Sequence, residues 1–109
     1  MINPQDIYDI CDKFNLKSLR CNDFLYWDFQ DEDILGSAVK YDFFFETISV
    51  TTEVLMASTE VMNLYSYHQV SLDELESSIQ ELIVKIKNAR AEIRKNRFKK
   101  DFEPIDKPE

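Results

Sequence analysis

The sequence predicts an all-α domain: a long antiparallel helical hairpin with one or two shorter N-terminal helices packed on it. Three observations predict this class. The 109 residues include one Gly and three Pro, and every Pro lies near a terminus. No Asn-Gly or Asp-Gly dipeptide marks a tight hairpin turn. Two long stretches, residues 37–68 and 72–100, can be read with helical periodicity.

The first predicted helix covers residues 4–14. Asn3 suits the N-cap and Pro4 suits the first helical position. The buried stripe expected on this helix consists of Ile7, Ile10, Cys11 and Phe14.

Residues 22–30 fit two interpretations. They form either a strand with Leu25, Trp27 and Phe29 facing inward, or a short helix capped by Asn22. Periodicity does not decide between them over so few residues. The acidic run that follows indicates a loop that ends near Gly36.

The stretch 37–68 decides the fold class. Glu46, Glu53 and Glu60 recur every seven residues, which aligns them on one side of a helix, whereas a strand would place them on alternating faces. Aromatic and β-branched residues such as Phe43 and Val50 favour strands instead. We expect a helix here. The alternative is an α+β fold in which a β-meander lies between two helices.

Residues 72–100 form the second long predicted helix. Ser71 and Glu74 match a capping box. Apolar residues follow at coiled-coil spacing, namely Leu72, Leu75, Ile79, Leu82, Ile86, Ala89 and Ile93. The short connection from 69 to 71 makes the two long helices fold back on each other. We therefore expect one domain over residues 1–100 and a flexible acidic tail over 101–109.

Charge is divided unevenly along the chain. Residues 1–84 carry a net charge of −12, residues 85–100 carry +7, and residues 101–109 carry −3. An acidic body repels nucleic acids and attracts basic protein surfaces, and a basic segment does the reverse.

Two groups of residues are candidates for partner binding. The basic group lies at the end of the last helix and comprises Arg90, Arg94, Lys95, Arg97, Lys99 and Lys100. The aromatic group comprises Tyr26, Trp27 and Phe29, because Trp and Tyr contribute strongly to interfaces. The competing interpretations are a solvated helix end that pairs internally and an aromatic cluster that belongs to the core.

We expect no catalytic, cofactor or metal site. A single Gly excludes a Gly-rich phosphate loop. Cys11, Cys21 and His68 cannot form a tetrahedral zinc site without carboxylates. The acidic run 28–33 lacks the ligand order of a calcium loop. An enzyme of unfamiliar type, using Asp31 or His68, is the remaining alternative.

The expected function is that of a non-enzymatic acidic protein-interaction module: an assembly subunit, adaptor, chaperone or inhibitor. It would bind a protein partner or a second copy through helix faces and opposed charge poles. The alternative is a nucleic-acid-associated protein that uses the basic helix end, or an acidic DNA mimic that inhibits a basic partner. The chain shows no secretory signal and no apolar run of about 18 residues, so we expect a cytoplasmic protein without a membrane span.

Overall fold

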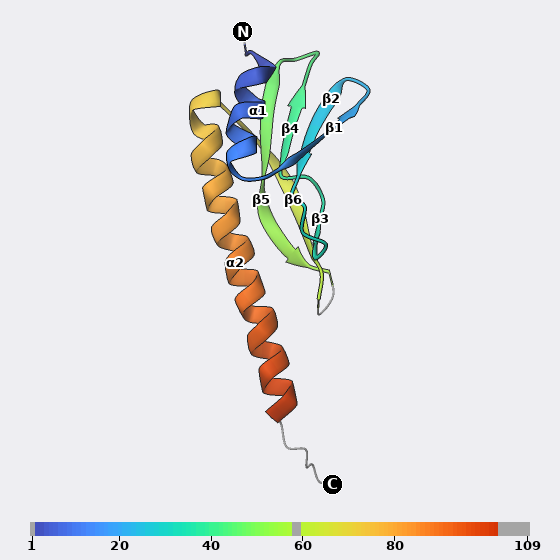
Figure 1. The fold of residues 1–109 in the computed structure, drawn as a ribbon, viewed down its shortest axis with the longest axis vertical. Coiled ribbons are helices and arrows are strands. Elements are labelled where there is room, and N and C mark those ends of the chain that lie inside the picture. The colour runs from blue at the N-terminus through green and yellow to red at the C-terminus, as the bar shows by residue number, and fades with distance from the viewer. Residues whose placement is uncertain (1, 58–59, 103–109) are drawn as a thin grey trace.

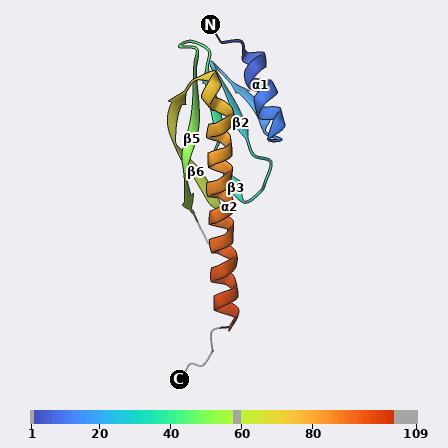
Figure 2. The same ribbon diagram turned by 90° about the vertical axis from the view of Figure 1, so that its left-hand side faces the viewer.

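The computed structural model describes residues 2–57 and 60–102, with side chains up to Lys95. The elements are α1 (Pro4–Lys13), β1 (Lys17–Cys21), β2 (Phe24–Asp28), β3 (Ile34–Leu35), β4 (Val39–Asp42), β5 (Thr47–Met56), β6 (Met62–Val70) and α2 (Leu72–Phe102). Within this described part, six strands form one sheet in the order β1-β2-β4-β5-β6-β3. The β3–β6 pair is parallel and the other pairs are antiparallel. Both helices lie on one side of the curled sheet, and α2 continues beyond it (Figures 1 and 2).

The predicted all-α class is wrong, because residues 37–68 form β4, β5 and most of β6. The three glutamates spaced seven residues apart lie in a turn, a strand and a loop. Glu46 lies in the β4–β5 turn with a φ of 54°, Glu53 lies on β5, and Glu60 follows β5. The β-branched residues of this stretch instead form the pleated, half-buried surface that they favour. The described residues therefore contain neither a helical hairpin nor a coiled coil, and the α+β alternative is nearer to the observed mixed fold.

Both terminal helices are confirmed, together with their capping residues. Asn3 Oδ1 accepts a hydrogen bond from Gln5 N at 3.0 Å, which caps α1. Ser71 N donates to Glu74 Oε1 at 3.0 Å and Glu74 N donates to Ser71 Oγ at 3.3 Å, so the predicted capping box begins α2. The α2 stripe packs mainly on β5 of the sheet and also contacts α1, and its fully buried members are Leu75, Ile79, Leu82 and Ile86.

The core lies between the inner face of the sheet and the two helices. Residues 24–28 form a strand, with Leu25 and Trp27 facing inward as the strand interpretation predicted. Trp27 is fully buried, and the ring of Tyr8 from α1 meets it edge-on at 5.2 Å. Cys11 lies in the same core, and burial raises the pKa of its thiol to about 12.

The path between β2 and β4 requires a glycine. The chain leaves β2, pairs with β6 through β3, and turns back to β4. Gly36 makes this turn with a φ of +89°, and a Cβ at this position would lie 2.8 Å from the Leu64 carbonyl oxygen. A side chain here would be strained by the backbone conformation and would also clash with β6.

Gly36→Ala should lower the free energy of unfolding by about 2 kcal/mol or more, because the variant combines a left-handed backbone with a backbone clash. Urea denaturation followed by circular dichroism would measure the loss. Leu35→Ala, at a half-exposed side chain one residue earlier, is the control and should cost under about 1 kcal/mol. Equal stability of the two variants would contradict this role for Gly36.

The two cysteines should differ sharply in reactivity. Cys21 is exposed, whereas Cys11 is buried and its raised pKa keeps it protonated. A thiol-reactive chromophore at neutral pH should modify one thiol per native chain and two after denaturation. Rapid modification of both thiols in the native protein would show that α1 is not packed as described.

Candidate functional site

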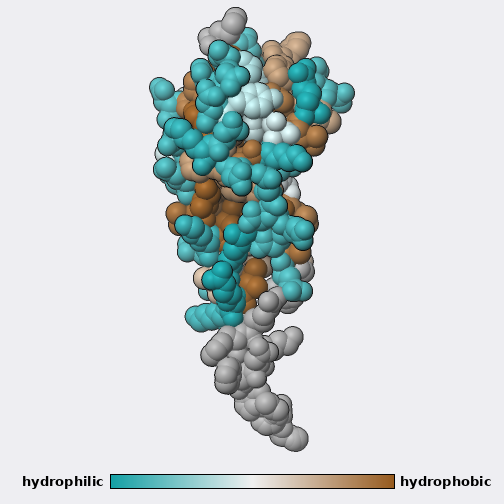
Figure 3. All heavy atoms as spheres, viewed as in Figure 1, coloured by the Kyte–Doolittle hydropathy of each residue, from teal (hydrophilic) through white to brown (hydrophobic). Residues whose placement is uncertain are grey.

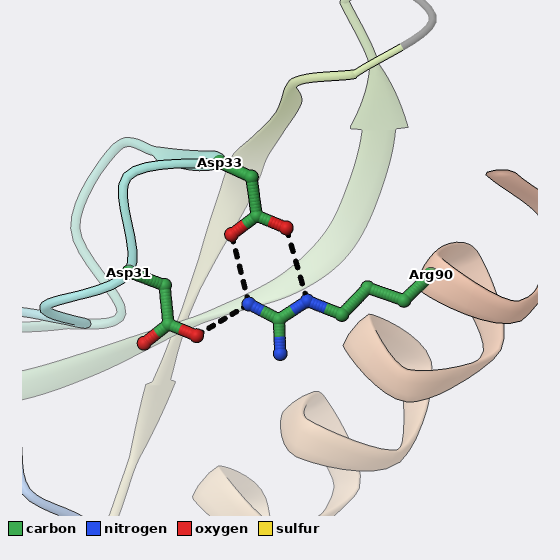
Figure 4. Close-up of polar contacts among 3 residues, drawn as sticks. All are labelled: Asp31, Asp33 and Arg90. Atoms are coloured by element: carbon green, nitrogen blue, oxygen red, sulfur yellow. Dashed lines mark hydrogen bonds and ion pairs between the residues drawn. The ribbon is translucent and has the colours of Figure 1, made fainter. Parts of the chain in front are cut away.

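Two cations on α2 bind separate parts of the curled sheet: Arg90 contacts the loop before the edge strand β3, and Lys85 contacts β5. Arg90 Nε donates to Asp33 Oδ2 at 3.0 Å, and Arg90 Nη2 donates to Asp33 Oδ1 at 2.8 Å and also to Asp31 Oδ2 (Figure 4). Lys85 Nζ donates to the carbonyl oxygen of Thr52 on β5 at 2.6 Å. Five residues separate the two cations, so their side chains leave the helix about 140° apart.

The Arg90 contact is a two-pronged pairing of a guanidinium with a carboxylate. Hydrogen bonds from Arg90 are the main cause of the lowered pKa of Asp33, and the same bonds raise the pKa of Arg90. Bidentate geometry makes such a pair stronger than a typical surface ion pair. The contact therefore ties the loop before β3 to the middle of α2.

The Lys85 contact depends on a local break in the β5–β6 ladder. Ser66 has a φ of 69°, and the strand register omits a pair between Thr52 and Ser66. Thr52 Oγ1 donates to the Ser66 carbonyl at 3.3 Å, while the Thr52 carbonyl accepts from Lys85. Lys85 thus binds a backbone acceptor at the point where the sheet ladder is interrupted.

The basic candidates differ in their surroundings. Arg90 is paired internally and its side chain is 29% exposed. Arg94 and Lys95 are exposed, and neither has an ion pair among the described side chains. Arg97, Lys99 and Lys100 lie on helical backbone, and their side chains fall outside the described part. The tail expected over 101–109 begins with two residues of α2, and residues 103–109 also lie outside it.

We call residues 94–102 the overhang. Ile93 is the last described side chain of α2 that packs against the core, and Figure 1 shows the helix continuing past the end of the sheet. The segment 94–100 contains five cations and no acidic residue. In the view of Figure 3, hydrophobic residues gather at mid-height, where α2 lies beside β5, with hydrophilic residues around them.

The aromatic candidates are not brought together. Trp27 is fully buried on the inner face, so it belongs to the core of the native fold. Tyr26 precedes it on the same strand and faces outward. Phe29 lies just after β2 and lines an open groove of about 390 Å³ beside Lys17 and Leu19 of β1.

Tyr26 instead belongs to a surface that the sequence analysis did not single out. We call it the open face: the outward-facing side chains of β1, β2, β4, β5 and β6. Lys40 Nζ lies 4.4 Å from the ring centre of Tyr67 and 5.4 Å from that of Phe24, so aromatic rings flank a cation on this face. The large aromatic and aliphatic side chains here are Leu19, Phe24, Tyr26, Leu55, Tyr65 and Tyr67. The alternation of residues 62–67, with Met62 and Leu64 between polar or tyrosine residues, was the signal that could have revealed it.

The residues considered for chemistry do not form a site. Asp31 and Asp33 are occupied by Arg90, and no group of three His, Cys, Asp or Glu in the described chain is placed to hold a metal ion. His68 Nε2 lies 3.2 Å from Ser66 Oγ, and no carboxylate in the described part orients this ring. No helix in the described segments is both long and apolar enough to span a membrane.

Arg90→Met should destabilise the fold by about 1 to 2 kcal/mol at neutral pH, a value discounted for solvent screening of a partly exposed pair. Because Arg90 lowers the folded-state pKa of Asp33, this contribution is present above the unfolded pKa and is lost as the pH falls through the folded pKa. The difference in the free energy of unfolding between the Arg90→Met variant and the unmodified chain should therefore become smaller below about pH 4. Urea denaturation at several pH values would measure it.

Arg94→Met provides the control, because Arg94 is exposed and has no ion pair in the described chain. It should change stability by less than about 0.5 kcal/mol at any of these pH values. A pH-independent loss in Arg90→Met would mean that the arginine stem, and not the ion pair, stabilises the loop.

Comparisons with known proteins return no match: no family model, no curated protein and no solved structure resembles this chain. What the protein does must therefore be inferred from its own surfaces.

Proposed function

We propose that this chain is a non-enzymatic protein-interaction module whose overhang binds an acidic surface of a partner protein. The observation that carries this proposal is the overhang itself, a basic continuation of α2 past its last described core contact at Ile93. The distribution of charge along the chain agrees with it, because residues 94–100 of the overhang belong to the segment with net charge +7.

The charge at the end of α2 favours a contact with another molecule. Helices in proteins owe most of their stability to packing of an apolar face. Among the described side chains this packing reaches Ile93, and the helical backbone continues to Phe102. Residues 94–100 carry five positive charges and no negative one, which suits them to bind an acidic surface.

The exposed cations of α2 indicate the kind of surface that the partner would present. Lys85 and Arg90 already hold acidic or carbonyl partners within the fold. Lys87, Arg94 and Lys95 are exposed and have no ion pair among the described residues. Their complement is a carboxylate-rich surface, which they would recognise by charge and steering more than by burial.

A protein partner fits better than a nucleic acid. The body, with a net charge of −12 over residues 1–84, opposes the approach of an extended polyanion. Only one aromatic residue, Phe98, interrupts the basic segment, which is little for stacking on bases. We place this interaction in the cytoplasm, where the exposed free thiol of Cys21 would stay reduced.

The double variant Arg94→Glu with Lys95→Glu should reduce capture of the partner at least about tenfold, because each reversal replaces attraction by repulsion. Capture from an extract of the native host, quantified by mass spectrometry, would measure it. The captured protein should be acidic, and added salt should release it.

Lys13→Glu with Arg20→Glu is the matched control, since it makes the same change in charge at two exposed cations outside the overhang and the open face. It should leave capture unchanged. Equal losses in both double variants would show that net charge, and not the overhang, governs binding. A DNA duplex retarded at low salt by the unmodified chain, but not by the overhang variant, would replace the protein partner with nucleic acid.

A further inference from the structure

We propose that the open face of the sheet is a homodimer interface, on which a second copy of this chain packs face to face. This inference goes beyond the proposed function, because it concerns a different surface and a different occupant. Both helices pack on the inner face. On the outer face, Ser37 and Ala38 accept hydrogen bonds from the buried Thr51, whereas Leu19, Tyr65 and Tyr67 stay exposed.

The composition of the open face differs from that of a solvated sheet surface. An antiparallel sheet with one face in water normally alternates apolar residues inside with polar residues outside. Here Leu19 is 59% exposed, Tyr65 43% and Tyr67 41%. Tyr26 and Phe24 are half-buried, with ring centres 6.0 Å apart. Tyrosines on a rigid sheet bury large areas at low entropic cost, which is typical of interfaces.

The charges of the open face indicate that the occupant is a second copy. Two copies of a chain with net charge −8 repel each other over most of their surfaces. On the open face, however, Lys17 and Lys40 are balanced by Asp28 and Asp42, while a further carboxylate, that of Glu53, lies 3.6 Å from Lys85. A surface with both signs of charge can complement itself across a two-fold axis.

The size of the face places the dimer at the lower end of specific interfaces. Five strands spaced about 4.8 Å apart, with about six residues along each, cover roughly 24 by 20 Å. Two copies would therefore bury about 1,000 Å² in total, which is the lower limit for a specific interface. Two such sheets would pack about 10 Å apart, as in a β-sandwich. We expect a dimer with a dissociation constant in roughly the micromolar range.

Another exposed apolar site provides the competing location. Phe44 and Phe45 are 76% and 70% exposed in the β4–β5 turn, and their rings stack edge-on at 4.8 Å. They form a tip of two side chains, which is too small to hold a dimer alone. This tip offers a matched control, because it also loses two aromatic residues when both are replaced by glutamate.

Sedimentation velocity from about 1 to 200 μM would measure dimerisation over the expected range. The unmodified chain should shift from monomer to dimer, Tyr26→Glu with Tyr67→Glu should stay monomeric, and Phe44→Glu with Phe45→Glu should dimerise normally. A monomer at every concentration, or a dimer lost only in the Phe44 and Phe45 variant, would overturn the proposal. The overhang variant Arg94→Glu with Lys95→Glu should still dimerise. Failure of the overhang proposal can therefore be distinguished from failure of the dimer proposal.

The salt response separates this dimer from a head-to-tail one. Added salt screens the repulsion between two acidic bodies, so a dimer through the balanced face should persist or tighten. A dimer in which the basic end of one copy binds the acidic body of another should instead dissociate, and that result would overturn the proposal.

A measurement without substitutions keeps the proposal testable if the face variant does not fold. Cys21 lies on the open face opposite Phe24 and is exposed in the single chain. Its alkylation should slow as the chain concentration rises through the dimerisation range. Alkylation at a constant rate, in a chain that sedimentation shows to be dimeric, would place the interface elsewhere and overturn the inference.

Discussion

The position of α2 in the curled sheet is the constraint on which both proposed surfaces depend. An apolar stripe buries one side of the first half of the helix, Lys85 binds β5, and Arg90 binds the loop before β3. Rotating the helix by one residue would turn the stripe by about 100° and break both contacts. The direction in which the helix leaves the body is therefore fixed by packing and by polar contacts together.

This arrangement also divides the cations of α2 into two groups. Lys85 and Arg90 act within the fold, whereas Arg94 and Lys95 remain available to another molecule. The acidic residues of the body are likewise unevenly placed, since the open face is close to neutral although the body is strongly acidic. The molecule thus offers a charged helix end suited to an oppositely charged partner and a balanced sheet face suited to its own copy.

Local signals in the sequence predicted both terminal helices. Capping and helical periodicity both depend on residues that are only a few positions apart in the sequence. The middle could not be predicted this way, since Glu46, Glu53 and Glu60 imitate a helix while strand pairing between distant residues decides the outcome. The candidate site shows the same division. Basic residues at the helix end were visible in the sequence, but the pairing of Arg90 with residues 57 and 59 positions earlier was not.

Screening explains why a binding helix would extend so far from an acidic body. At physiological ionic strength, charges interact weakly beyond a Debye length of about 8 Å. Among the described side chains, Arg90 is the last cation of α2 that forms an ion pair with the body, and a helix rising about 1.5 Å per residue carries Lys100 roughly 15 Å farther. At that distance the carboxylates of the body are screened from Lys100, whereas Arg94 and Lys95, about 6 to 8 Å beyond Arg90, lie near the limit of this screening. A shorter helix would leave the same cations within the field of the body, where they would bind its own carboxylates as Arg90 does.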